Sequence, residues 1–289
     1  MGILIALQHR SQYAYDRPIQ LGPQILRLRP APHDRSQIRQ YALQVTPAEH
    51  HLYWFQDPFA NHLARVLLPQ PTREFTVDVN ITLDLQPFNP FDFLVADYAE
   101  TYPFAYPQPL RRALLPYFEP EPAGGLLQQW LAGIDRRPAS LIGFLFDLNQ
   151  RLQRDLRYEL RLESGVQSCE ETLSRACGSC RDSAWLLVQI LRHLGLAARF
   201  VSGYLVQLDP DSRVNGTGND DFGLHAWTEV YVPGAGWLGL DPTSGLFATE
   251  QHIPLACAAD PECAAPISGS LEAAGTHFSF THQLQRLSS

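Results

Sequence analysis

Apolar side chains recur at helical spacing between residues 180 and 194, and they also occupy most of the opposite face of the predicted helix. Ser179 followed by Asp182 forms a capping-box pattern that begins the helix, and Gly195 supplies a left-handed residue that ends it. A helix that is apolar on nearly all sides is buried, so this stretch predicts the central helix of a core. Its apolar positions are Ala184, Trp185, Leu186, Leu187, Val188, Ile190, Leu191 and Leu194.

Residues 1–86 alternate between apolar and polar side chains, and Pro, Gly, Asn and Asp separate the alternating runs. The alternation is strictest over residues 75–85, where every second side chain is apolar. A period of two is typical of strands with one face in a core. The region therefore predicts an N-terminal β-sandwich-like domain, with strands at 3–15, 24–29, 37–45, 50–55, 62–68 and 74–85.

Residues 87–124 are rich in proline, which excludes long helices and central strands. The prolines are interleaved with Phe and Tyr, whose burial is favourable. We therefore expect an ordered connector packed between domains, because a flexible linker would carry few aromatic residues.

Residues 125–289 predict a second domain that mixes helices and strands. Helices are expected at 126–132, 141–157 and 170–175, ahead of the central helix. The turn at 233–236 joins two strands into a hairpin, and the final strand is assigned to this same domain. The expected strands are 197–208, 224–232, 237–241 and 276–287.

The composition is that of a soluble globular protein, with 45% hydrophobic and 18% charged residues. A formal charge of −8 argues against a nucleic-acid partner. No apolar run is long enough to span a membrane, so no membrane partner is expected, and residues 1–7 lack the basic flank and cleavage site of a signal peptide. These features favour a cytoplasmic location, where five cysteines do not suggest a disulfide framework.

Cys180 lies in the first turn of the central helix, where free N–H groups and the helix dipole favour an anion. Its thiol should therefore ionise more easily than that of a free cysteine. His225 and Asp241 lie on the predicted hairpin and have the right chemistry for a base and its orienting partner. A tight turn would set Asp241 opposite Thr228, so the pairing needs a bulge or a wider loop.

The motifs around these residues resemble the core of the bacterial transglutaminase-like superfamily. They are Gly178-Ser-Cys180-Arg-Asp182, Leu194-Gly-Leu-Ala-Ala-Arg-Phe-Val-Ser-Gly203-Tyr204, His225-Ala-Trp-Thr-Glu-Val-Tyr231 and Trp237-Leu-Gly-Leu-Asp241-Pro-Thr243.

The resemblance covers roughly residues 140–250, and residues 1 to about 85 resemble the β-rich N-terminal domain of such proteins. It implies an α+β fold, in which a papain-like core has its buried helix packed on an antiparallel sheet. It also implies that Cys180, His225 and Asp241 are nucleophile, base and orienter. No cofactor or metal is expected. The whole chain resembles the amino-terminal part of larger bacterial proteins, so a further domain or partner protein is expected if it is a fragment.

The backbone N–H of Cys180 would help to hold an oxyanion, but the sequence does not indicate the second hydrogen-bond donor. Gln167 and Trp227 are candidates, and each also has a purely structural interpretation. Trp227 lies on the same predicted strand face as His225, where it would either line a cleft or pack in the core.

Cys177 and Cys180 form a C-x-x-C pair, with Cys169 nearby. A redox or three-thiolate metal site is one interpretation, but it leaves the His and Asp motifs unexplained. A second hypothesis is that oxidation pairs Cys177 with Cys180 and silences the nucleophile. The side-chain oxygens of the Asp- and Asn-rich segment 209–223 could bind calcium, and that question stays open. Their spacing matches no EF-hand, so a solvated loop is expected.

These features predict a cysteine enzyme that acts on amide bonds of peptides or proteins through a thioester on Cys180. A peptidase or amidase is favoured over a crosslinking transglutaminase, because no feature indicates a tunnel that excludes water and admits a lysine amine. A non-catalytic peptide-binding module is the alternative from another class.

Overall fold

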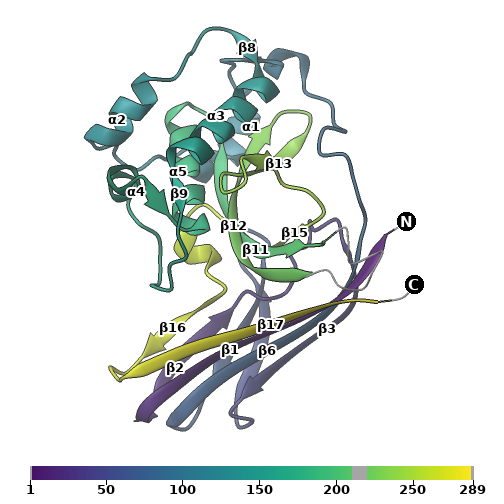
Figure 1. Cartoon of the computed structure of the whole chain (residues 1–289), viewed down its shortest axis with the longest axis vertical. Helices are drawn as coiled ribbons and strands as arrows, with labels where there is room; N and C mark the ends of the chain where they lie inside the picture. The colour runs from purple at the N-terminus through teal and green to yellow at the C-terminus, as the bar shows by residue number, and fades with distance from the viewer. Residues whose placement is uncertain (1, 210–219, 288–289) are drawn as a thin grey trace.

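The computed structural model describes residues 2–209 and 220–287 (Figure 1). The chain forms an all-β lower part and a mixed upper part, and the connector runs between them along one side (Figure 1). None of the described helices is long and apolar enough to cross a membrane.

The lower part is a sandwich of two sheets of four described strands each. The strict alternation over residues 75–85 becomes β6, whose apolar side chains are all buried. The first sheet has the order β17-β1-β6-β3, with β17 (Thr276–Arg286), β1 (Ile3–Ile19), β6 (Thr72–Leu85) and β3 (Gln37–Thr46). The second has the order β16-β2-β5-β4, with β16 (Ile267–Leu271), β2 (Leu21–Leu26), β5 (His62–Leu67) and β4 (His51–Gln56).

The final strand does not belong to the upper part. The prediction that assigned it to the same domain as the rest of residues 125–289 is therefore wrong. β17 pairs with β1 from Tyr15↔Thr276 to Ile5↔Arg286, and β16 pairs with β2. Alternation shows that a strand has a buried face, but it does not say which distant edge the strand completes. The first and the last described strands, β1 and β17, therefore both build the β-sandwich, and they lie side by side (Figure 1).

The upper part is built on α5 (Cys180–His193), which packs against β11 and β12 of a five-stranded sheet. The predicted capping box is present at Ser179 and Asp182, and Gly195 has a φ of +80° at the helix end. The helix is pinned to the sheet by the Thr228 hydroxyl, which donates to the Ala184 carbonyl over 2.8 Å. The sheet has the order β14-β13-β12-β11-β15, with β14 (Leu246–Phe247), β13 (Gly236–Asp241), β12 (Asp221–Val232), β11 (Ala198–Gln207) and β15 (His252–Ala258).

The three predicted helices ahead of α5 form and surround it (Figure 1). Their buried faces join α5 in one hydrophobic core. They are α2 (Gly125–Ala132), α3 (Leu141–Asp155) and α4 (Cys169–Arg175), with the two-residue strands β9 (Arg157–Tyr158) and β10 (Cys177–Gly178) on either side of α4.

The connector is ordered as expected, but it packs mainly on the upper part rather than between the domains. The Tyr102 hydroxyl donates to the Leu194 carbonyl, and the Tyr106 hydroxyl donates to the Tyr231 carbonyl. Both tyrosines are buried in the core around α5, where aromatic burial is most favourable. The connector and the segments beside it contain α1 (Gln108–Ala113), β7 (Thr101–Tyr102), β8 (Ala139–Ser140) and the 3-10 turns η1 (Asp97–Ala99) and η2 (Leu115–Tyr117); η3 (Pro261–Ala264) follows β15.

The two parts share a continuous apolar interface. Tyr204, Phe222 and Ile253, from the upper sheet, belong to the same hydrophobic cluster as the core of the sandwich. The imidazole of His9 on β1 also lies 2.8 Å from the Tyr204 hydroxyl. The sandwich therefore supports the ends of the strands that carry the site.

Candidate active site

Cys180 is held at the first turn of α5 by Asp182. This carboxylate accepts hydrogen bonds from the N–H and the hydroxyl of Ser179, both at 2.7 Å, and from the Gln167 N–H at 2.7 Å. Arg161 adds contacts of 2.6 and 2.8 Å. Burial raises the pKa of Asp182, but these hydrogen bonds outweigh burial and lower that pKa. The start of the helix, and with it the thiol, is fixed by a buried ionised group.

The β12–β13 hairpin has a three-residue loop at 233–235, followed by paired positions that include Thr228↔Leu240. Continued by one residue, this register sets Asp241 opposite Trp227. The tight turn expected from the sequence would have set it opposite Thr228. Of the two remedies, a bulge or a wider loop, the wider loop is the one that the chain uses.

The new register places His225 and Asp241 on one face as diagonal neighbours, within reach of each other's side chains. His225 Nε2 lies 3.2 Å from Asp241 Oδ2, and both side chains are less than a tenth exposed. Since Nε2 faces the carboxylate, Nδ1 is the ring nitrogen that is free to face Cys180.

The imidazole of His225 interacts with both of its predicted partners. Burial lowers the pKa of His225, but hydrogen bonds to Asp241 and Cys180 and the negative charges of both groups outweigh burial and raise that pKa to about 10. The structure thus brings Cys180, His225 and Asp241 together, in an arrangement that favours the protonated form of the imidazole.

Asp241 has further partners that sequence reasoning missed. Its Oδ1 accepts from the Thr243 N–H at 2.8 Å, and its Oδ2 lies 3.1 Å from the Ser244 hydroxyl. His252 Nε2 lies 3.4 Å from the same Oδ2. Burial raises the pKa of Asp241, but hydrogen bonds from His225 and His252 outweigh burial and hold that pKa well below its ordinary value.

His252 donates to Asp241 as a neutral group. Its Nδ1 accepts from the Thr249 N–H at 3.2 Å, so the proton of the neutral ring sits on Nε2, facing the carboxylate. The ring also packs edge-on against Trp227, with centroids 5.2 Å apart. No sequence signal pointed to His252, because it reaches the site through the pairing of β15 with β11.

Gln167 receives no support as an oxyanion donor. Its side chain is buried and lies 3.1 Å from the Thr172 hydroxyl. Oriented to satisfy both ends, its amide donates to Thr172 and to the Cys177 carbonyl, and accepts from Arg175. These contacts tie α4 to β10, which is a structural role.

Trp227 lies behind His225 and is 1% exposed. Its ring centroid is 6.4 Å from that of His225, and it packs with Val201 and Cys257. The indole N–H has no partner among the described residues, and Gly239 lies beside it. Trp227 is therefore a core residue that packs beside the imidazole of His225. It lines the site only through that contact.

Cys177, Cys180 and Cys169 do not form a cluster of metal ligands among the described residues. The Cys177 thiol donates to Glu159 Oε2 at 2.7 Å, a hydrogen bond that is the main cause of its raised pKa. All five cysteines are free. The redox role of Cys177 stays a hypothesis. Residues 210–219, which make up most of the expected Asp- and Asn-rich loop, lie outside the described residues, so calcium binding there stays open.

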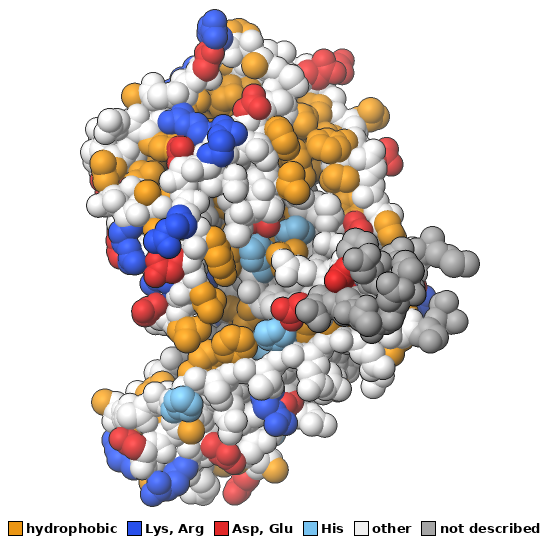
Figure 2. Space-filling model, in the orientation of Figure 1, with side chains coloured by type: hydrophobic (Ala, Val, Ile, Leu, Met, Phe, Trp, Pro, Cys, Tyr) orange, Lys and Arg blue, Asp and Glu red, His pale blue; other side chains and the backbone are white. Residues whose placement is uncertain are grey.

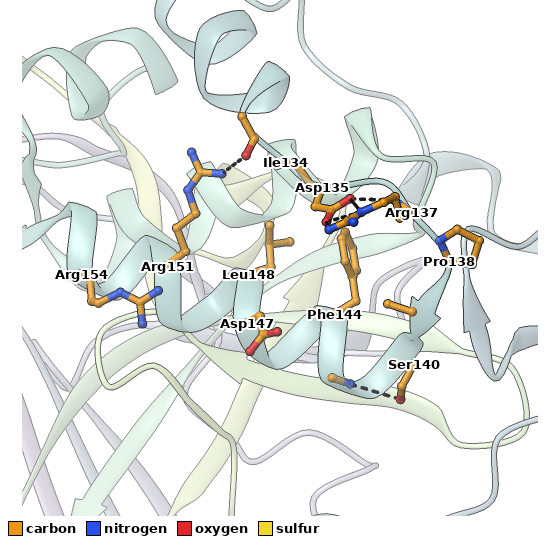
Figure 3. Close-up of a pocket in the computed structure, with 13 residues that line it drawn as sticks. Ile134, Asp135, Arg137, Pro138, Ser140, Phe144, Asp147, Leu148, Arg151 and Arg154 are labelled. Atoms are coloured by element: carbon orange, nitrogen blue, oxygen red, sulfur yellow. Dashed lines mark hydrogen bonds and ion pairs between the residues drawn. The ribbon is translucent and has the colours of Figure 1, made fainter.

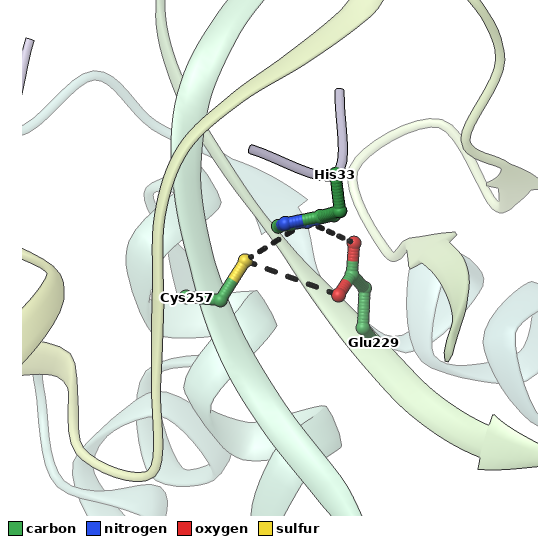
Figure 4. Close-up of side chains that lie close together, drawn as sticks. All are labelled: His33, Glu229 and Cys257. Atoms are coloured by element: carbon green, nitrogen blue, oxygen red, sulfur yellow. Dashed lines mark hydrogen bonds and ion pairs between the residues drawn. The ribbon is translucent and has the colours of Figure 1, made fainter. Parts of the chain in front are cut away.

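Two groups of side chains in the described chain bring possible metal ligands together. The first is His225, Asp241 and His252, where hydrogen bonds to Asp241 account for the geometry. The second is His33, Glu229 and Cys257, beside the interface of the two parts (Figure 4).

The second group of side chains is already in contact with a cation, the Arg199 guanidinium. Arg199 Nη2 lies 2.5 Å from Glu229 Oε2, and the same nitrogen lies 3.4 Å from His33 Nε2. Cys257 Sγ lies 3.4 Å from that His33 nitrogen, and burial raises the pKa of its thiol well above the ordinary value. A divalent ion would have to compete with the guanidinium. These contacts therefore favour a network of hydrogen bonds and an ion pair over a metal site.

Histidine side chains are visible in the middle of the face in Figure 2, between the upper and lower parts.

A separate hollow of about 660 Å³ lies along the outer side of α3, lined by Asp135, Arg137, Arg151 and Arg154 among others (Figure 3). Cys180, His225 and Asp241 do not line it. The three predicted catalytic residues therefore lie outside this hollow.

Comparison with known families identifies the relationship. Residues 128–242 match the transglutaminase-like superfamily, and residues 5–84 match the bacterial transglutaminase-like N-terminal region. The core of the chain, residues 128–242, belongs to the transglutaminase-like superfamily. The α+β fold, with a transglutaminase-like core and an N-terminal β-rich region, agrees with this membership. The membership supports an enzyme whose nucleophile is a cysteine.

Two bacterial proteins are similar to this chain in sequence. An uncharacterized protein of Mycobacterium tuberculosis is 26% identical over 271 residues, covering 90% of this chain and 85% of that protein. The protein-glutamine gamma-glutamyltransferase of Pseudomonas aeruginosa is 30% identical over 205 residues, covering 67% of this chain but 25% of that protein.

A solved structure shares the fold of the whole chain. It is that of a "Putative Cysteine Protease from Cytophaga hutchinsonii", with a TM-score of 0.69 and 18% identity. The match covers 100% of this chain and 92% of the other. The transglutaminase-like core and the β-sandwich therefore occur together in another protein.

Proposed function

We propose that this protein is a cysteine peptidase or amidase that works through an acyl-thioester on Cys180. The observation that carries the proposal is the convergence of the Cys180 thiol, His225 and the buried Asp241 carboxylate at the start of α5. The chemical class follows from this set, because a thiolate beside an imidazolium is suited to attack an amide carbonyl.

In the first step the Cys180 sulfur forms a bond to the carbonyl carbon, and the charge on the oxygen is held in part by the Cys180 N–H. His225 then gives its Nδ1 proton to the leaving amine as the carbon–nitrogen bond breaks, which leaves a thioester. Water attacks the thioester carbon while His225 accepts its proton. The carbon–sulfur bond then breaks, which releases the acid and restores the Cys180 thiolate beside the protonated imidazole. Asp241 holds the imidazole in one tautomer throughout.

The second candidate is transfer of the acyl group to an amine, as in a crosslinking transglutaminase. The similarity to the protein-glutamine gamma-glutamyltransferase of Pseudomonas aeruginosa favours it. The same thioester serves both reactions, and they differ only in whether water or an amine attacks it. Peptide or protein amides are the proposed acyl donors in either case, and the cytoplasmic location stays a prediction.

A small electrophilic thiol probe tests the proposal against a non-catalytic peptide-binding module. We expect fast labelling at Cys180 that falls at least tenfold in His225→Ala, because the thiolate needs its partner. Equal labelling in both proteins would overturn the proposal. Mass spectrometry of products from a glutamine-containing peptide, with and without an added primary amine, then separates hydrolysis from transfer.

A further inference from the structure

Apolar side chains are exposed along the segment 157–163. It reads Arg-Tyr-Glu-Leu-Arg-Leu-Glu, and its apolar members Tyr158, Leu160 and Leu162 are 52%, 67% and 66% exposed. The charged residues between them turn toward the protein, where Glu159 accepts from Cys177 and Arg161 binds Asp182. A row of exposed apolar side chains whose charged neighbours are anchored is typical of a binding surface.

This row begins next to the nucleophile. β9 pairs in parallel with β10, which sets Tyr158 opposite Gly178, two residues before Cys180. The Glu159 N–H continues the pairing by donating to the Gly178 carbonyl over 2.9 Å. Burial is the main cause of the raised pKa of Tyr158, and the negative charge of Cys180 is the next. The phenol ring is therefore within electrostatic reach of the sulfur.

The backbone of the segment has one occupied edge and one open edge. The carbonyls of Arg161 and Glu163 accept from Arg181 Nη2 at 3.1 and 2.8 Å, on the side of α5. In an extended chain the intervening residues direct their N–H and C=O groups to the opposite side. Those of Leu160 and Leu162 have no hydrogen-bond partner within residues 2–209 and 220–287.

We propose that residues 158–162 are the docking edge for an extended peptide acyl donor. The peptide pairs with the free backbone groups of Leu160 and Leu162, and its apolar side chains pack beside Tyr158 and the two leucines. This inference rests on the proposed function and names the surface that binds its peptide substrate. Backbone groups repeating every two residues match a peptide strand and give a small amide or a lipid nothing to pair with. The Arg161–Asp182 ion pair holds the edge in place before binding.

The test uses the full-length protein and two exposed-leucine variants, Leu160→Ser and Leu162→Ser. Their control is Leu94→Ser, because Leu94 is 84% exposed in the connector. We expect each docking-edge variant to lower kcat/KM for an apolar peptide donor roughly tenfold, mainly through KM, while Leu94→Ser changes nothing. A donor with one N-methylated backbone amide should lose a similar factor in the unchanged protein. Kinetics equal to those of Leu94→Ser in both variants, with no effect of N-methylation, would overturn the inference.

Labelling by the small thiol probe separates this failure from failure of the proposed function. The docking-edge variants should label at Cys180 as fast as the unchanged protein, because the probe does not need the edge. If no donor is turned over, binding of the same peptides to Cys180→Ala replaces the kinetics. Peptide binding that the serine variants weaken supports the inference, and binding that they leave unchanged overturns it.

Discussion

Asp241 and His225 meet diagonally across the β12–β13 hairpin, with Nε2 and Oδ2 3.2 Å apart. The meeting depends on the loop at 233–235, because one residue fewer between the strands would turn Asp241 to the other face. Asp241 is 1% exposed, so its carboxylate acts on the imidazole without solvent between them.

The first prediction concerns this carboxylate. Asp241→Asn should lower kcat/KM by roughly 10²–10⁴, because the amide cannot hold the His225 tautomer or stabilise its proton. Steady-state kinetics with a peptide donor and a thermal unfolding curve would check it. Activity within a factor of two of the unchanged protein would remove Asp241 from the site.

His252 should act as a positioning residue for Asp241. His252→Phe removes the neutral donor to Oδ2 and should lower kcat roughly tenfold, with little change in KM. His252→Gln keeps a donor on a long side chain and should restore part of the loss. If the two variants have the same kcat and the same pH profile, the hydrogen bond has no catalytic effect.

The third prediction is a dependence of stability on pH. The pKa of His225 is raised from 6.5 to about 10 in the folded protein, so folding favours the protonated ring. The stabilisation is fully present below about pH 6.5 and is lost as the pH rises toward 10. The difference in free energy of unfolding between the unchanged protein and His225→Ala should therefore shrink across that range. Chemical denaturation at several pH values measures it, and a constant difference would contradict the assignment.

The fourth prediction concerns oxidation. If a Cys177–Cys180 disulfide silences the nucleophile, activity lost on mild oxidation should be retained in Cys177→Ser, whose hydroxyl can still donate to Glu159. Peptide mass mapping before and after reduction would detect the disulfide. Equal sensitivity of the variant would leave direct oxidation of Cys180 as the cause.

The fifth prediction concerns the C-terminal strands. Removing residues 266–289 takes away β16 and β17 and leaves the edges of β1 and β2 unpaired. We expect the shortened protein to aggregate or unfold at a much lower temperature, although Cys180, His225 and Asp241 are retained. Unchanged thermal unfolding of the soluble variant would contradict the role of these strands.

Local rules are enough to predict the start of α5 and the position of Cys180 on it. A capping box, an apolar helical pattern and a stop at Gly195 act within one turn or one helix, so neighbouring residues carry the information. In the same way, the alternation along β12 is enough to place His225 and Trp227 on one face of that strand.

The remaining features depend on contacts between distant segments. The position of Asp241 relative to His225 depends on a loop register, and His252 reaches Asp241 because β15 pairs with β11. β17 completes the sandwich because β1 offers an open edge nearly the whole chain length away. Strand pairing is set by hydrogen bonds and packing across the fold, and a periodic pattern records only that a strand has a buried side.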